Sequence, residues 1–358
     1  MNLRKIIIPV VIILITLLSS CSNETKKRMN LQPNAFGVSN GIVLVADDDV
    51  WEGPVGDSIR FYFSAPYLIL PQPEPIFDIK HFTPQSLQTE PIRQEFRHII
   101  FVGNIQDDHS PTTRIIRKDI GVERVDKAYK DPSFSSLEGK NKWAKNQIVI
   151  YLFGKTDKEL ANNVVANFPA IAKRFQKRDR NLVNADTYTA GINTKIMDEV
   201  KKTMDASIKI PAEYFIAVND GETIWLRKEN SRISSNILMT RVPYKSKNQF
   251  SKKYIKEIRN KIGKKYVSTR ADSTYMQTND IDLPIFSTIT TLNGQYCMEA
   301  RGIWEIVNDF MGGPFIGYLI HNPDKKELFY VEGFLHAPSQ KKRNYMQQLE
   351  LILSTVEY

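Results

Sequence analysis

Hydrophobic residues recur along the chain with two periods, one typical of strands and one typical of amphipathic helices. In the first half, short apolar or alternating segments predict strands at residues 41–46, 76–82, 97–105 and 147–153. Helices are predicted at 53–63 and from Leu160 to Phe175, where apolar residues lie on one side. Pro169 should begin a second helical segment there, because proline lacks the amide that an internal turn requires.

The second half repeats this style after the polar connection 178–181 and a helix with apolar Ile192, Ile196, Val200 and Met204. Strands are predicted at 214–218, 223–228, 237–242, 285–292, 296–301, 315–320 and 328–335. A helix over 248–262 should end at Gly263, and a last helix should follow Ser339. Short hairpin links imply largely antiparallel pairing.

The pattern predicts an α+β protein with two lobes, each a mostly antiparallel sheet packed with helices. A chain of this length exceeds the size at which single cores tend to divide. We expect a signal peptide at 1–20, a polar tether at 21–40, an N-terminal lobe at 41–182 and a C-terminal lobe at 183–358. The order of elements leaves open whether the lobes are duplicates, because no residue-level repeat is visible.

The amino end carries the pattern of a bacterial lipoprotein signal. Arg4 and Lys5 precede an apolar stretch over residues 6–18, which ends in Leu18-Ser19-Ser20-Cys21. The stretch is shorter than the roughly 20 apolar residues that span a bilayer and is followed by polar residues. We expect cleavage before Cys21 and lipidation of its thiol, the alternatives being a plain signal peptide or an uncleaved short anchor.

Lipid on Cys21 would hold the chain at a bilayer, because each buried CH₂ of an acyl chain contributes about 0.8 kcal/mol. Ser22 stands where aspartate would favour inner-membrane retention in some bacteria, and no acidic cluster follows. We therefore expect a lipid-anchored protein of the cell envelope, in the outer membrane and facing the periplasm. The triplet Lys26-Lys27-Arg28 either touches anionic headgroups or forms a solvated tether.

Composition is that of a folded globular body, with 42% hydrophobic and 25% charged residues. Loss of Arg4 and Lys5 with the signal lowers the formal net charge from +9 to +7. The densest basic region coincides with the predicted helix 248–262 and is interpreted as its solvated side, so no nucleic-acid partner is expected.

The chain lacks phosphate loops, dinucleotide glycine patterns, nucleophile elbows and zinc-ligand spacings. Its histidines, His81, His98, His109, His321 and His336, are scattered, so neither a metal nor a cofactor is predicted. Cys297 is the only cysteine left after lipidation of Cys21. It lies in a predicted strand, and we interpret it as a buried inert thiol rather than a nucleophile.

A candidate binding cleft is predicted near Arg301 and Trp304. Arg301 could pair with a carboxylate or phosphate, Trp304 could stack on a sugar or peptide, and Glu299 could act as acid or base. Gly312 and Gly313, with Pro314, predict a sharp turn with exposed amides. In the alternative, Trp304 fills a core, Arg301 bridges Glu299 or Glu305, and the glycines form a tight corner.

Glu332 is the second candidate carboxylate. If it lies on a strand next to that of Glu299, the two could form a pair suited to glycan hydrolysis. The alternative is an ion pair of Glu332 with Arg343 or Arg301. A further feature is the proline-rich run at 70–75, which is either a binding ledge or the cover of a sheet edge.

Several motifs together resemble an uncharacterised family of lipoproteins from Bacteroidota, classified as a domain of unknown function. They are the lipobox at Cys21, Leu70-Pro71-Gln72-Pro73-Glu74-Pro75, Ser273-Thr274-Tyr275-Met276, Arg301-Gly302-Ile303-Trp304, Met311-Gly312-Gly313-Pro314-Phe315, and Glu332-Gly333-Phe334 with Ala337-Pro338. The resemblance implies an envelope location and transfers no catalytic residue.

The sequence favours a membrane-anchored lipoprotein that binds or scaffolds another envelope component, whether protein, glycan or lipid. The alternative is an envelope hydrolase that uses Glu299 or Glu332 on glycan or peptide, and a lipid carrier would require a sizeable apolar cavity. Close carboxylates in a solvent-reached pocket would favour hydrolysis, whereas burial and ion pairing of these carboxylates would favour binding.

Overall fold

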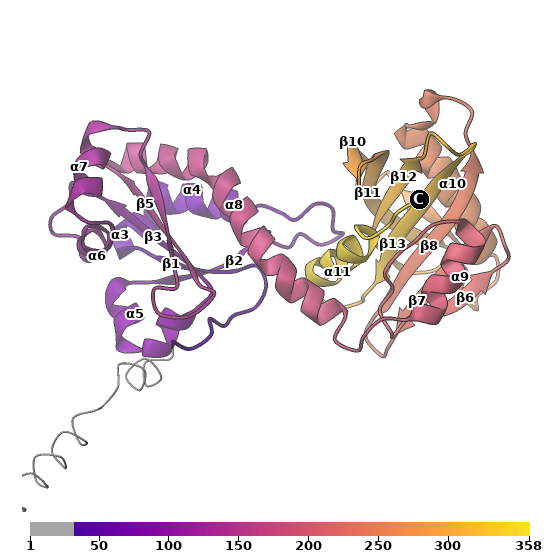
Figure 1. Cartoon of the computed structure of the whole chain (residues 1–358), viewed down its shortest axis with the longest axis horizontal. Coiled ribbons are helices and arrows are strands. Elements are labelled where there is room, and N and C mark those ends of the chain that lie inside the picture. Colours follow the sequence, from indigo (N-terminus) through magenta and orange to yellow (C-terminus); the bar gives the residue numbers. More distant parts are fainter. Residues whose placement is uncertain (1–31) are drawn as a thin grey trace, which may run out of the picture. The chain divides into compact units, whose positions relative to one another are not determined.

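The computed structural model describes residues 32–358, so the signal, Cys21 and the triplet 26–28 lie outside the described residues. The described chain forms two compact units (Figure 1). The first contains the residues up to Gly56 and Lys80–Val164, and the second contains Asp57–Ile79 and Val165–Tyr358. The predicted α+β class with two sheet-and-helix units is confirmed.

The first unit has a mixed sheet of five strands in the order β2-β1-β3-β5-β4. The strands are β1 (Gly41–Val45), β2 (Asp78–Phe82), β3 (His98–Asn104), β4 (Ser136–Lys140) and β5 (Ile148–Gly154). β3 pairs in parallel with β1 and β5, whereas β4 and β5 are antiparallel. Parallel neighbours need a long crossover, which α6 (Pro111–Ile120) and α7 (Val122–Lys130) provide between β3 and β5.

Helical segments also connect the other strands of this unit. They are α3 (Asp48–Glu52), α5 (Pro84–Thr89) and the short 3₁₀ segment η1 (Pro91–Glu95). α4 (Pro54–Phe63) begins in this unit and belongs to the second unit from Asp57 onward. β3 and β5 are buried almost throughout, which explains their unbroken apolar sequence. Antiparallel hairpins would give strands in which polar and apolar residues alternate. β3 and β5 do not alternate in this way, because both of their faces are buried.

The second unit has an eight-stranded sheet in the order β10-β11-β12-β13-β8-β7-β6, with β9 also paired to β11. The strands are β6 (Phe215–Asn219), β7 (Thr223–Glu229), β8 (Ser234–Pro243), β9 (Tyr275–Asn279), β10 (Phe286–Leu292), β11 (Gln295–Val307), β12 (Gly312–His321) and β13 (Glu327–His336). All these pairs are antiparallel, as the short links predicted.

Helices cover both faces of this sheet (Figure 1). One face packs against α9 (Thr194–Met204) and α11 (Arg343–Leu353), through residues such as Val200 and Leu349, and is called the α11 face below. The opposite face packs against α10 (Lys252–Tyr266), through Ile255, Ile258 and Ile262, and is called the α10 face below. Because side chains alternate along a strand, each strand residue belongs to one of these two faces.

Three predicted helix boundaries are wrong. The segment 178–181, predicted to be a polar connection, lies inside α8 (Asp157–Thr187). α8 runs through Pro169 without a second start, and its buried residues Leu160 and Phe175 lie on either side of the proline. α10 continues past Gly263 to Tyr266. Gly263 serves close packing instead, because a Cβ there would lie 2.5 Å from the carbonyl oxygen of Met276. Within residues 32–358, no helix combines the length and apolar character needed to cross a bilayer.

Candidate binding sites of the second unit

Arg301 lies in an ion-pair network on the α11 face. Its Nε donates to Glu299 Oε1 at 2.7 Å, and its Nη1 bonds to Glu350 of α11. Tyr318 donates to Glu299 Oε2 at 2.8 Å, and Tyr67 donates to Glu350. The neighbouring carboxylates raise the pKa of Arg301 despite its desolvation. Glu299 is thus held by two donors, as in the alternative in which Arg301 bridges it.

Trp304 lies on the other face of the same strand. It is 3% exposed and belongs to the core beside α10, with its ring 5.5 Å from that of Phe334. Trp304 is separated from Arg301 by three positions, which places their side chains on opposite faces of β11. The sheet therefore does not bring these two residues into one cleft.

Glu332 forms a buried ion pair on the α10 face. Both Glu332 and Arg259 of α10 have fully buried side chains, with Nε and Oε2 2.7 Å apart. Tyr330 donates a second hydrogen bond to Glu332 Oε2 at 2.7 Å, and the guanidinium of Arg259 lies 3.7 Å from the ring centre of Phe315. The partner is neither Arg343 nor Arg301, because α10 covers this face.

Glu299 and Glu332 do not form a carboxylate pair. β12 separates their strands, and Glu332 shares a face with Gly317 and Ala300 through the strand register. Glu299 precedes Ala300 and so faces the opposite side. Both carboxylates are also engaged by arginine and tyrosine, so neither is positioned for glycan hydrolysis.

Gly312 and Gly313 lie at the start of β12 and do not form the predicted turn, which is at 308–310. Gly313 is required by a close approach, because a Cβ there would lie 1.9 Å from the carbonyl oxygen of Leu335. The glycines and Pro314 thus allow β12 to pair closely inside the sheet, and their amides are not presented to a ligand.

The run 70–75 supports a helix end. Glu74 is buried, and its carboxylate accepts hydrogen bonds from the amides of Lys342 and Arg343 at the start of α11. The chain is held there by a hydrogen bond from the amide of Tyr67 to the carbonyl oxygen of Glu74 at 2.7 Å. A carboxylate at a helix N-terminus also interacts favourably with the helix dipole.

Cys297 is fully buried on the α11 face, as the sequence predicted. Desolvation raises the pKa of its thiol to about 11, with a smaller contribution from Glu299. The thiolate that nucleophilic attack requires is therefore disfavoured at neutral pH.

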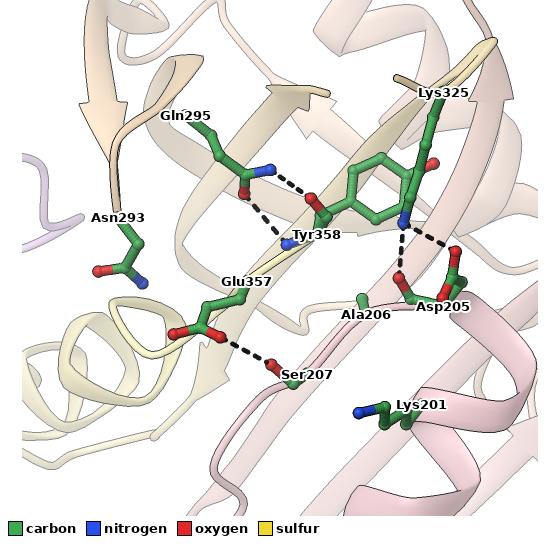
Figure 2. Close-up of a pocket in the computed structure, with 9 residues that line it drawn as sticks. All are labelled: Lys201, Asp205, Ala206, Ser207, Asn293, Gln295, Lys325, Glu357 and Tyr358. Carbon is green, nitrogen blue, oxygen red and sulfur yellow. Dashed lines mark hydrogen bonds and ion pairs between the residues drawn. The ribbon is translucent and has the colours of Figure 1, made fainter. Parts of the chain in front are cut away.

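A polar pocket of about 530 Å³ lies on the second unit (Figure 2). Five parts of the chain line it: the end of α9, the segment after it, the β10–β11 turn, the β12–β13 connection and the last residues. The lining residues are Lys201, Asp205, Ala206, Ser207, Asn293, Gln295, Lys325, Glu357 and Tyr358.

Most polar groups of this pocket are positioned by one another. Lys325 Nζ lies 3.0 Å from Asp205 Oδ2 and 3.8 Å from the ring centre of Tyr358. The hydrogen bond from the Lys325 side chain to the Asp205 carboxylate is the main reason that the pKa of Asp205 is lowered. Gln295 holds the backbone of Tyr358 through its side-chain amide, as Figure 2 shows.

Lys201 is the exception. It is exposed, and among the described residues it has no ion-pair partner. Asp205 and Glu357 balance the charges of Lys201 and Lys325, so the pocket carries both signs. Within residues 32–358, no group of three histidine, cysteine or carboxylate side chains is placed to hold a metal ion.

The sequence did not reveal this pocket. Its residues are spread from 201 to 358, and most are ordinary polar residues in loops or near the ends of elements. These residues come together only because the end of α9, the β10–β11 turn, the β12–β13 connection and the last residues of the chain are neighbours in the folded unit. No spacing in the sequence could have indicated that.

Comparison with known families finds two matches, both to domains of unknown function. Residues 193–355 match a family described as Domain of unknown function (DUF4837), and residues 35–187 match one described as Domain of unknown function (DUF8532). This is consistent with the uncharacterised family that the motifs resemble. No match was found among curated proteins.

Among solved structures, the Ran-binding protein Mog1p of Saccharomyces cerevisiae is similar over 42% of this chain and 89% of that chain. The sequence identity is 8% and the TM-score is 0.27. A likeness this weak supports no argument about the fold or the function.

Proposed function

We propose that the protein is a lipid-anchored envelope protein whose second unit binds another envelope component. The lipid on Cys21 would tether the chain to the outer membrane on its periplasmic side, and the folded units would meet the partner there. The observation that carries the binding role is the polar pocket of Figure 2, in which Lys201 has no ion-pair partner among the described residues.

The charge of this pocket favours a ligand group that carries both signs. Lys201 is free to pair with a carboxylate of the partner, and the exposed Glu357 can accept from an ammonium or amide group. Because the other polar groups are already positioned by hydrogen bonds, little ordering is needed on binding. We therefore propose a peptide segment of an envelope component as the ligand.

The alternative, an envelope hydrolase using Glu299 or Glu332, gains no support from these two carboxylates. Glu332 is fully buried in its pair with Arg259, and Glu299 is held by Arg301 and Tyr318. A lipid carrier would need an apolar cavity, whereas this pocket is lined by charged and amide groups.

Affinity capture of the lipidated protein from its native envelope tests the proposal. The charge reversal Lys201→Glu should remove a specific copurifying component, as identified by mass spectrometry. The control Lys202→Glu reverses a neighbouring exposed charge on α9 that does not line the pocket, and it should retain that component. Equal recovery from both variants, or no specific component at all, would refute the role of the pocket.

A Cys21→Ser variant tests the tether in the same preparation. It should leave the membrane fraction and lose incorporated fatty acid. If the variant still incorporated fatty acid, Cys21 would not be the site of lipidation.

A further inference from the structure

A second polar groove lies on the second unit, between the end of β9 and the turn after β11. Two hollows, of about 460 and 450 Å³, share Gln277 and Glu305. One is continued by the loop 280–282 and the other by the turn 308–310. None of these residues lines the pocket of Figure 2, so the groove is independent of the proposed function.

The floor of the groove is a ladder of amide and carboxylate groups. Gln277 and Glu305 are cross-strand partners on β9 and β11. The two oxygens of Glu305 accept from Gln277 Nε2 at 2.7 Å and from Asn279 Nδ2 at 2.8 Å. Because two amides orient the carboxylate and both come from a strand, its remaining acceptor positions are fixed in space.

Two large apolar side chains line this groove and are almost fully exposed. Phe310 is 106% exposed and lines one hollow, and Ile281 is 92% exposed and lines the other. Neither packs on the core, although the core beside α10 is only a few residues away in sequence, at Ile285 and Ile306. An exposed aromatic ring beside fixed polar groups is the arrangement that binds a ligand with one apolar and several polar surfaces.

The charge of the groove narrows the ligand class. Asp280, Asp282, Glu305 and Asp309 line it against a single cation, Lys256, which is already paired with Asp280 at 2.6 Å. Anionic ligands would be repelled. A neutral sugar offers hydroxyl groups that donate to carboxylates and accept from amides, and its C–H face stacks on an aromatic ring.

We propose that this groove binds a neutral glycan chain, with Glu305 and Gln277 bonding the hydroxyls and Phe310 stacking on a sugar ring. The test is titration calorimetry of the full-length protein in detergent with two neutral probes, chitotetraose and maltotetraose, and with one anionic probe, a hyaluronan tetrasaccharide. At least one neutral probe should bind, and the anionic probe should bind more weakly.

Phe310→Ala and Glu305→Gln should each lower the affinity for the bound neutral probe about tenfold. Phe215→Ala is the matched control, because Phe215 is also exposed in this unit but lies on β6, outside the groove. It should bind like the original protein. Phe310→Ala should also unfold at the original midpoint, because the ring of Phe310 is fully exposed.

Three results would overturn the proposal. The first is that neither neutral probe binds, and the second is that the Phe310 and Glu305 variants bind like the control. The third is that Phe310→Ala abolishes self-association or binding to vesicles of phosphatidylethanolamine and phosphatidylglycerol without affecting any sugar. Loss of glycan binding would leave capture through Lys201 unchanged, so the two proposals fail separately.

Discussion

The buried pair of Arg259 and Glu332 makes a sharp prediction about the stability of the second unit. Replacing Arg259 by methionine keeps much of the side-chain volume but removes the charge. Glu332 would then keep only its hydrogen bond from Tyr330, inside a core that excludes water. Leaving one charge of a buried pair without its partner costs about 3 to 5 kcal/mol, a large part of the 5 to 15 kcal/mol typical of a domain.

The double variant Arg259→Met/Glu332→Leu separates the ion pair from the packing. It removes both charges, so the desolvation penalty disappears, and the remaining loss is the hydrogen bonds of Thr278 and Tyr330 to the pair. We expect it to lose about 1 to 3 kcal/mol, less than either single variant. The coupling energy of the cycle should therefore be several kcal/mol.

Urea unfolding at pH 7, followed by circular dichroism and by tryptophan fluorescence, to which Trp225 and Trp304 of the second unit contribute, measures these free energies. Lys228→Met is the control, because Lys228 and Glu213 form a partly exposed surface pair 2.6 Å apart that should contribute about 1 kcal/mol or less. The reasoning would be refuted if Arg259→Met unfolded like the control, or if the double variant lost the sum of the two single losses.

Two other predictions follow from buried positions of the same sheet. Gly313→Ala should destabilise the second unit by at least about 3 kcal/mol in the same urea assay, because its Cβ would meet a backbone oxygen that cannot move aside; an unchanged midpoint would contradict the close pairing of β12 and β13. The raised pKa of Cys297 favours the folded state below the ordinary thiol pKa and is lost as pH rises through the folded pKa of about 11. Between pH 8 and 11 the original protein should therefore lose roughly 2 kcal/mol more stability than Cys297→Ala does, and parallel pH profiles would argue against burial of the thiol.

The sequence was most informative where a local pattern of apolar residues is compatible with only one kind of buried element. The apolar run of β3 and the helical spacing of Val200 and Met204 in α9 could be recognised directly, because only burial stabilises such patterns. Burial of Cys297 also followed from its apolar strand. Proline and glycine were less reliable as signals of helix ends. Pro169 and Gly263 both lie inside helices, because tertiary packing stabilises the helix beyond each of them.

Strand pairing and strand face were decided only by the tertiary structure. One sheet became mixed because helices, not hairpins, connect β1, β3 and β5. Arg301 and Trp304 are close in sequence yet lie on opposite faces, whereas Arg259 and Glu332 are 73 positions apart and form a pair. Short-range patterns specify periodicity and burial, but the register that joins distant strands depends on the packing of the whole unit. The sequence by itself therefore indicated most of the strands and helices, and the lipid anchor stays a prediction from it. The fold decided which polar residues share a site, because side chains from distant strands and loops meet only after the sheets have paired.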